Sequence, residues 1–235
     1  MTTPKPVAVI AGAGPGNGAA LARRFTEAGY AIALLSRHTT TLDPVPDDQS
    51  AARSFACDVT DPISVERAFA SIRSDLGVID VLLYNAGSAV FSDAETITFD
   101  QFEQAWRVNA YGALLCSRQV IPGMKDKTAG AIIFIGATAS RRGSVQTAAF
   151  APAKAAQRSL AESMARLLWP AGIHVALIVI DGVVDLPKSR AAMPNKPPDT
   201  FVDPAGVADI AFQLCNQQPR AWSFEVEARP CTEKW

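Results

Sequence analysis

The chain has 235 residues, 49% of them hydrophobic, which is enough to bury one core but little for two. Its 22 lysines and arginines balance 23 aspartates and glutamates without a run of like charge, which argues against nucleic acid and anionic membranes as partners. The four cysteines and two histidines show no metal-ligand or redox spacing, so we expect no metal site. Free thiols and the absence of an N-terminal targeting segment favour a cytoplasmic protein.

Short apolar runs alternate with longer segments of helical periodicity. The runs predict strands at Val7–Ala11, Ala31–Leu35, Ser54–Cys57, Val81–Tyr84, Ala131–Ile135, Ile173–Ile180 and Ser223–Val226. The longer segments predict helices at Gly18–Ala28, Ile63–Asp75, Phe99–Gly123, Phe150–Trp169 and Pro204–Asn216. Because the strands are apolar throughout, we expect a parallel sheet of about seven strands with helices on both faces. The order predicts a single Rossmann-like, doubly wound α/β domain.

Two polar, proline-containing segments interrupt this alternation, Thr39–Ser50 and Leu186–Thr200. The second follows a late strand, at the edge of the sheet where ligands bind in such folds. We therefore expect residues 186–200 to form a substrate lid.

Glycines gather where the first predicted strand gives way to a helix, in Gly12-Ala13-Gly14-Pro15-Gly16-Asn17-Gly18. Asn17 breaks a Gly-x-Gly-x-x-Gly pattern, but a Gly-x-x-x-Gly-x-Gly spacing fits. Glycines let a pyrophosphate approach the N–H groups at the start of the helix. A turn needed for packing alone is the alternative, and the position after a strand favours dinucleotide binding. The residues assigned to this site are Gly12, Gly14, Gly16, Asn17 and Gly18.

The end of the second strand bears on the choice of coenzyme. An NAD-selective site would place an acid there, but this chain has Ser36-Arg37-His38. A guanidinium matches a 2′-phosphate, so Arg37 and His38 favour NADP(H) over NAD(H). A solvated loop cation is the alternative for Arg37.

Further motifs follow the later strands. Cys57-Asp58-Val59 ends the third strand, Asn85-Ala86-Gly87 ends the fourth, and Asn109 lies in the long helix. Phe150 and Lys154 have the spacing of a Tyr-x-x-x-Lys helix. With the glycine turn, these residues resemble the short-chain dehydrogenase/reductase family over nearly the whole chain.

The resemblance implies coenzyme contacts and a mechanism. It places Asp58 and Val59 at the adenine, and adds to the coenzyme site Asn85, Ala86, Gly87, Lys154, Gly182 and Val183. In the family a tyrosine transfers the proton while the nicotinamide transfers the hydride. The lysine lowers the pKa of the tyrosine and holds the ribose, and an asparagine, matched by Asn109, supports a proton path.

Four positions depart from that pattern. Phe150 stands at the tyrosine position, Ala137 at the serine position, Asp181 at a proline position and Leu186 at a threonine position. Phenylalanine and alanine have no proton to give, and losing a positioned acid costs ~10²–10⁴ in rate. The standard mechanism is therefore not expected.

Other side chains offer replacements. Thr138 keeps a hydroxyl one residue from the lost serine, and Asp181 could be a proton donor if its pKa were raised. The alternatives are a β-branched residue at a strand end and a turn-capping aspartate. Arg141 and Arg142 could hold an acidic substrate or form a solvated pair.

Three functions fit these residues. The first is an NADP(H)-dependent oxidoreductase of a small carbonyl or alcohol that uses a non-standard proton donor. The second is an inactive nucleotide-binding sensor or scaffold with the same fold. Hydride transfer to an activated alkene or imine is a third.

The two helices Phe99–Gly123 and Phe150–Trp169 are rich in small and apolar residues, and the resemblance implies pairing through them into a homodimer or homotetramer.

Overall fold

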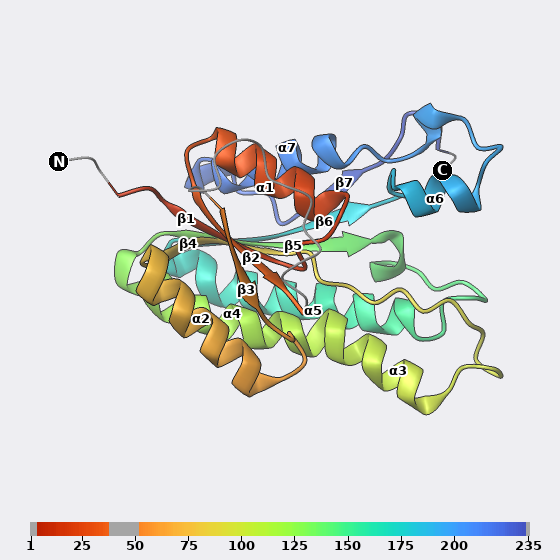
Figure 1. Ribbon diagram of the computed structural model, residues 1–235, viewed down its shortest axis with the longest axis horizontal. Helices are drawn as coiled ribbons and strands as arrows, with labels where there is room; N and C mark the ends of the chain where they lie inside the picture. Colours follow the sequence, from red (N-terminus) through yellow and green to blue (C-terminus); the bar gives the residue numbers. More distant parts are fainter. Residues whose placement is uncertain (1–3, 38–51, 234–235) are drawn as a thin grey trace.

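The computed structural model describes residues 4–37 and 52–233. Seven parallel strands form one sheet in the order β3-β2-β1-β4-β5-β6-β7 (Figure 1). The strands are β1 (Val7–Ala11), β2 (Ala31–Ser36), β3 (Ala52–Ala56), β4 (Ile79–Tyr84), β5 (Gly130–Ala137), β6 (Ile173–Ile180) and β7 (Glu225–Ala228). The doubly wound, Rossmann-like fold predicted from the sequence is confirmed.

Helices cover both faces of the sheet, α1 and α7 on one and α2, α4 and α5 on the other (Figure 1). The α-helices are α1 (Asn17–Glu27), α2 (Pro62–Leu76), α3 (Phe99–Trp106), α4 (Gly112–Lys127), α5 (Phe150–Leu168), α6 (Pro187–Ala192) and α7 (Pro204–Cys215). Shorter turns are the π-turn η1 (Arg107–Tyr111) and the 3-10 turns η2 (Thr138–Ser140), η3 (Trp169–Ala171), η4 (Pro198–Thr200) and η5 (Pro219–Ala221).

Alternating residues of each strand feed two separate apolar cores. In β1, Val7, Val9 and Ala11 belong to one core, and Ala8 and Ile10 belong to the other. Since all five are buried, the continuous apolar run in the sequence is explained by a central strand with helices on both faces.

Several predicted elements have other bounds in the structure; the strand predicted at Ser54–Cys57, for example, is Ala52–Ala56. The long helix predicted over Phe99–Gly123 is interrupted by η1, and the last strand lies two residues later than Ser223–Val226. This strand lies at the sheet edge and is only partly buried. Two of its residues are glutamates, Glu225 and Glu227, which accept hydrogen bonds from arginines, so a search for apolar runs does not locate the strand correctly.

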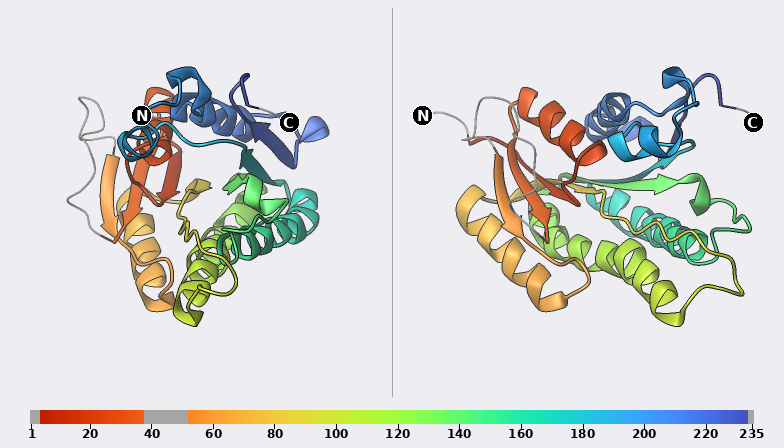
Figure 2. Two further views of the ribbon diagram at one scale, coloured as in Figure 1. Left: turned by 90° about the vertical axis from the view of Figure 1, so that its right-hand side faces the viewer. Right: turned by 45° about the vertical axis from the view of Figure 1, so that its right-hand side comes forward.

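The segments that follow the strands gather at one end of the molecule (Figures 1 and 2). Helix α6 lies in the predicted lid segment at this end. The whole polar segment Thr39–Ser50, together with His38, lies outside the described residues. No helix in the described part of the chain is long and apolar enough to span a bilayer.

Candidate functional site

The glycine turn packs closely against the residues that follow β4. Gly12 has φ 88°, and a Cβ on it would stand 2.5 Å from the backbone of Ala86. A Cβ on Gly18 would stand 2.9 Å from the carbonyl oxygen of Gly12, whereas one on Gly14 would meet nothing within 4 Å. Gly12 and Gly18 therefore allow close packing, and Gly14 leaves backbone open to a ligand.

The start of α1 is suited to an anion. Its N-cap, Gly16, has no side chain to accept from the first-turn N–H groups. Such groups, with the positive end of the helix dipole, favour phosphate. One neighbour bears on access: a Cβ on Gly16 would overlap Cδ2 of Leu186. The segment leading into α6 therefore lies directly against the glycine turn.

A cleft of about 420 Å³ extends from this turn along the carboxyl ends of the strands. Arg37 and Asp58 lie in its wall, as predicted for the adenosine end. Although burial opposes it, hydrogen bonds from Thr60 and the charges of Arg37 and Arg107 lower the pKa of Asp58. An ionised acceptor therefore faces this end of the cleft. The cleft is lined by Gly12, Ala13, Gly14, Leu35, Ser36, Arg37, Cys57, Asp58, Val59, Asn85, Ala86, Gly87, Ser88, Gln104 and Val108.

Asn85 has a structural task within this wall. Its Nδ2 donates to the carbonyl oxygen of Gly12 at 2.7 Å, and its backbone N–H donates to Ala11 at 2.8 Å. The asparagine side chain therefore holds the glycine turn against β4 and leaves Ala86 and Gly87 beside the cleft.

Lys154, Asn109 and Gln157 form one buried network. Nζ of Lys154 donates to the carbonyl oxygen of Ile135 at 2.7 Å and to Oε1 of Gln157 at 3.1 Å. Nε2 of Gln157 donates to the backbone oxygen of Asn109 at 3.0 Å, which ties α5 to the π-turn η1. Burial lowers the pKa of Lys154 to about 7.

Only the nitrogen of the Asn109 side-chain amide forms hydrogen bonds. Its Nδ2 donates to Ser88 and Ala105, and its Oδ1 is buried without a partner. This oxygen is 3.4 Å from the position of a Cβ on Gly87, so it points toward the floor of the cleft. A buried acceptor without a donor is costly, and π-turns are frequent at functional sites.

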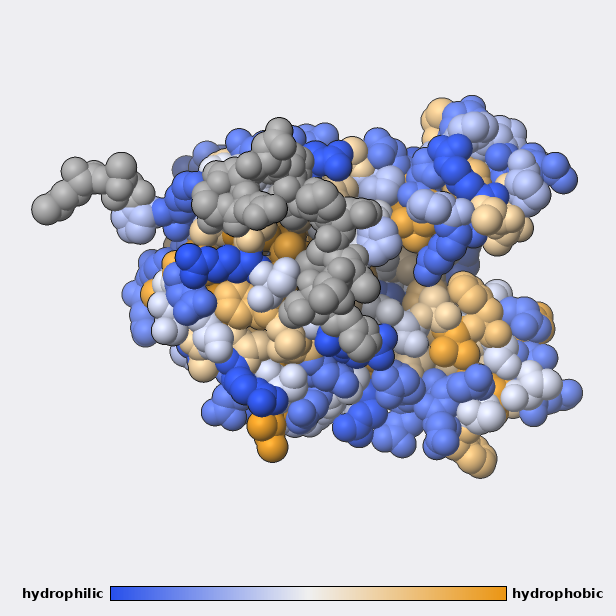
Figure 3. Space-filling view, viewed as in Figure 1, coloured by the Kyte–Doolittle hydropathy of each residue, from blue (hydrophilic) through white to orange (hydrophobic). Residues whose placement is uncertain are grey.

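Phe150, which the resemblance in sequence places at the family's tyrosine position, begins α5 and contacts another aromatic ring. Its ring centroid is 5.9 Å from that of Phe91, which is 66% exposed. Ala137, at the end of β5, is only partly buried, and its N–H donates to Oγ of Ser140. This end of the site is therefore apolar, and Figure 3 shows a hollow on the same side of the molecule, between the α6 region and the loops opposite it.

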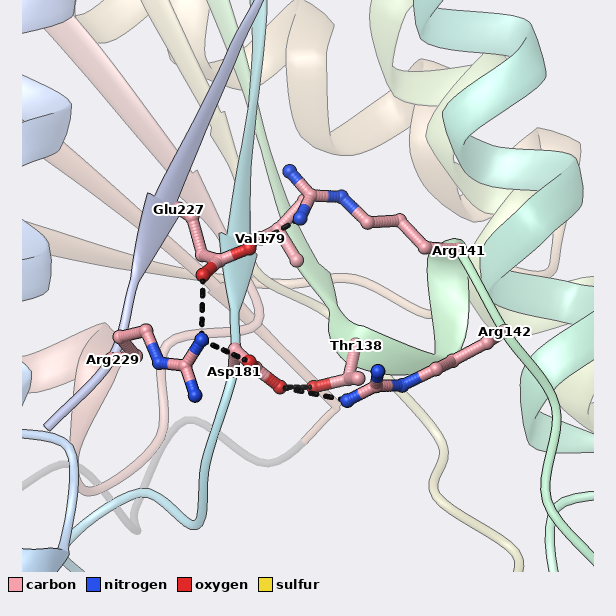
Figure 4. A pocket seen from close by; sticks show the side chains of 7 residues that line it. All are labelled: Thr138, Arg141, Arg142, Val179, Asp181, Glu227 and Arg229. Carbon is pink, nitrogen blue, oxygen red and sulfur yellow. Dashed lines mark hydrogen bonds and ion pairs between the residues drawn. The ribbon is translucent and has the colours of Figure 1, made fainter. Parts of the chain in front are cut away.

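Thr138 and Asp181 contact each other in a separate cavity of about 120 Å³ (Figure 4). The Thr138 hydroxyl donates to Oδ1 of Asp181, and Arg229 reaches Oδ2 at 3.4 Å. Arg142 lies 4.0 Å from the same carboxylate, and Arg141 pairs with Glu225 and Glu227 of β7. This cavity shares no lining residue with the cleft beside the glycine turn.

The pairing of the strands explains this cluster. Ala137 pairs with Ile180, and Ile180 pairs with Ala228, so the next residue of each strand lies in one row. Those residues are Thr138, Asp181 and Arg229. After β6, Gly182 has φ 149°, and Val183 accepts from the N–H of Val202 at 2.9 Å, which fixes the start of the predicted lid.

Three residues near the site, Gln157, Phe91 and Arg229, were not predicted from the sequence. Gln157 lies three residues after Lys154, a helical spacing that could have revealed it. Phe91 and Arg229 reach the site through the loop after β4 and the end of β7, and no spacing in the sequence predicts either contact.

A glycine turn at a helix start, below a cleft across the carboxyl ends of parallel strands, defines a dinucleotide-binding α/β protein. The family model described as short chain dehydrogenase matches residues 6–193. The 3-oxoacyl-(acyl-carrier-protein) reductase MabA of Mycobacterium tuberculosis is 29% identical over 217 residues, which cover 89% of this chain and 85% of that protein. The chain belongs to the short-chain dehydrogenase/reductase family of oxidoreductases, which confirms the resemblance seen in its sequence.

Two further relatives differ in what their names describe. The 2-(R)-hydroxypropyl-CoM dehydrogenase of Xanthobacter autotrophicus is 32% identical over 192 residues, covering 78% of this chain and 76% of that protein. A metagenomic short-chain oxidoreductase in complex with NADP is 26% identical, with a TM-score of 0.82, covering 97% of this chain and 98% of that chain.

Proposed function

We propose that this protein is an NADP(H)-dependent oxidoreductase of a small carbonyl or alcohol, and that its proton comes from a group other than tyrosine. The observation that carries the proposal is the cleft beside an uncapped helix start, with Arg37 and Asp58 at one end and Lys154 behind its floor. The similar metagenomic oxidoreductase in complex with NADP supports the same coenzyme.

The chain's own residues define the tasks in this proposal. The N–H groups at the start of α1 bind the pyrophosphate, Asp58 and Val59 contact the adenosine, and Arg37 pairs with the 2′-phosphate. Lys154, Gly182 and Val183 hold the nicotinamide end. When bound, the coenzyme supplies or accepts the hydride. Phe150 and Phe91 form an apolar wall for the substrate and exclude water from it.

Thr138 and Asp181 enter the proposal as a polar pair in the neighbouring cavity, where they would contact a substrate that extends into it. Because the hydroxyl donates to the carboxylate, the lone pairs of the threonine oxygen are free to accept from an alcohol. Arg142, whose side chain is 68% exposed, could hold an acidic group of the substrate at the rim.

The experiment is a panel of aldehydes and ketones with NADPH, in which coenzyme oxidation is followed by absorbance. We expect turnover above the blank with at least one carbonyl. Gly12→Ala should abolish it because the new Cβ would strike Ala86, whereas Gly206→Ala, where a Cβ meets nothing, should match wild type. If the wild-type protein oxidises no NADPH with any carbonyl, the proposal that it is such an oxidoreductase is refuted.

A nucleotide-binding sensor or scaffold is the second candidate, and the loss of both hydroxyls at Phe150 and Ala137 favours it. It requires the same NADPH binding without hydride transfer to any carbonyl or alcohol. NADPH binding combined with no turnover across the panel would favour this candidate over the enzyme.

We also propose that the protein forms a homodimer or homotetramer. Phe99, Phe102 and Trp106 are exposed on one side of α3, at the spacing of a helical stripe. An exposed apolar stripe is typical of a surface that pairs with another chain. Sedimentation at several concentrations should give twice or four times the mass of 24.9 kDa, and a monomer throughout would overturn the proposal.

A further inference from the structure

Lys154 is a buried cation whose hydrogen-bond acceptors are both neutral. The residue is 5% exposed, and its ammonium donates to a backbone carbonyl and to the amide oxygen of Gln157. No carboxylate in the described part of the chain forms an ion pair with it. An ammonium has three N–H donors, so one proton of Lys154 is not taken up by these two acceptors.

The ammonium also lies next to the coenzyme cleft. Nζ is 3.8 Å from the position of a Cβ on Gly87, and Gly87 lines that cleft. Phe150 lies one helical turn earlier on α5, and positions four apart on a helix are neighbours. By contrast, Thr138 and Asp181 open into the other cavity.

We propose that Lys154 is itself the acid of the reaction, giving a proton directly or through one water to the substrate oxygen, and that Gln157 is the positioning residue for its ammonium. This inference rests on the proposed function and identifies its proton donor.

The atoms and electrons balance in the direction of carbonyl reduction. The carbonyl carbon gains the hydride that bound NADPH supplies, and the π electron pair moves to the oxygen. An O–H bond forms as one Nζ–H bond of Lys154 breaks. The carbonyl is reduced to an alcohol, the coenzyme is oxidised, and the neutral amine takes a proton back from solvent. Alcohol oxidation runs through the reverse steps.

Burial makes this exchange feasible near neutral pH. It lowers the pKa of Lys154 to about 7, and an acid works best when its pKa is near the working pH. No neighbouring charge contributes to this shift. The charged or titratable groups on the elements around Nζ are Asp100 and Glu103 of α3, Arg107 and Tyr111 of η1, Arg141 and Arg142 after η2, Arg158, Glu162 and Arg166 of α5, His174 of β6, and Asp181.

Gln157 is placed to hold this lysine. Its amide is fully buried and bridges Lys154 and the backbone of Asn109, so each of its ends is fixed. An amide oxygen accepts a hydrogen bond without adding a charge. A carboxylate at the same place would favour the charged lysine and raise its pKa.

The first test needs neither coenzyme nor turnover. Nitrogen NMR of protein labelled at the lysine Nζ should show one lysine that titrates near pH 7, and Lys154→Arg should remove that signal. Lys125→Met, which removes an exposed lysine, should leave the signal in place. If every lysine titrates near its usual pKa of about 10.4, the proposal is overturned.

The second test uses the pH dependence of reduction with a carbonyl that wild type accepts. Reduction should slow as the pH rises through about 7, because the proton must be on Lys154. Gln157→Glu should move this midpoint upward by about 1 pH unit or more. Gln213→Glu adds the same charge on an exposed face of α7 and should not move it.

Lys154→Arg keeps the charge but cannot give up its proton, so it should lower kcat by ~10²-fold or more. An arginine variant within tenfold of wild type, or an equal midpoint in wild type and Gln157→Glu, would overturn the role of the lysine alone. If Gln157→Glu does not fold, the arginine variant and the NMR titration decide. Absence of turnover in wild type would instead contradict the proposed function.

Discussion

Phe150 is the residue that we propose stands at the family's tyrosine position. Its ring sits against Phe91 at the start of the helix that carries Lys154. Phe150→Tyr would add a proton donor one turn from the lysine, and a positioned acid contributes ~10²–10⁴ in rate. We therefore expect kcat for carbonyl reduction to rise at least tenfold in steady-state assays.

Phe91→Tyr is the matched control, because it adds the same hydroxyl to the other ring of the pair. It should leave kcat near that of wild type. Equal effects of the two substitutions would mean that the position of the hydroxyl relative to Lys154 is unimportant.

Arg37 controls the choice of coenzyme if it pairs with a 2′-phosphate. Arg37→Asp should weaken NADPH by ~10-fold or more and leave NADH nearly unchanged, since only NADPH loses a charge-assisted contact. Calorimetric titration with both coenzymes measures this. Arg23→Asp, on the exposed side of α1, controls for net charge. A similar loss for both coenzymes in Arg37→Asp would refute the role.

Lys154 also makes stability depend on pH. Its pKa is about 7 in the folded protein and near 10.5 in the unfolded chain, so between these values the unfolded chain binds more protons. The cost of the buried lysine therefore grows as the pH falls from about 10.5 to about 7, at up to ~1.4 kcal/mol per pH unit.

Urea denaturation of wild type and Lys154→Met measures this cost. The free energy of unfolding of the wild type, relative to that of the methionine variant, should rise as the pH is raised from about 7 to about 10. A difference that does not change with pH would show that the lysine keeps an ordinary pKa.

At the scale of elements, the segment after β6 acts on the coenzyme turn. Leu186 lies against Gly16, at the helix start where a phosphate would bind. Leu186→Ala should open this place and raise NADPH affinity severalfold, as measured by calorimetry. Leu167→Ala, which shortens an exposed leucine on α5, should change nothing. Unchanged or weaker binding in Leu186→Ala would mean that the leucine does not obstruct the site.

Patterns within single elements were predictable from the sequence. Buried strands were recognised as apolar runs, and the glycine turn was recognised by the spacing of its glycines after the first strand. Asn109 and Lys154 lie on helical elements, as predicted. The π-turn η1 was not predictable, because its residues continue the helical period of α3 and α4. It is nonetheless the element that carries Asn109.

Contacts between elements were not predictable, because they depend on register and loop paths. Thr138, Asp181 and Arg229 meet because three strands end in one row. The contact between Gln157 and Lys154 could have been predicted, since their helical spacing is visible in the sequence. Phe91 depends on the path of the loop after β4.

At the scale of the whole molecule, the cleft proposed to bind the coenzyme and the cavity of charged residues shown in Figure 4 both lie at the carboxyl ends of the strands of one sheet. The cleft keeps the groups expected to bind the nucleotide. We propose that Phe150 stands at the position of the family's proton donor, one helical turn before the buried Lys154. Coenzyme binding is thus the claim on which both candidate functions and the role of Lys154 depend.

Calorimetric titration of the wild-type protein with NADPH tests this claim most directly. We predict saturable binding of one NADPH per chain, tighter than the binding of NADH, and its loss in Gly12→Ala but not in Gly206→Ala. No binding of NADPH or NADH by folded wild-type protein would contradict the account.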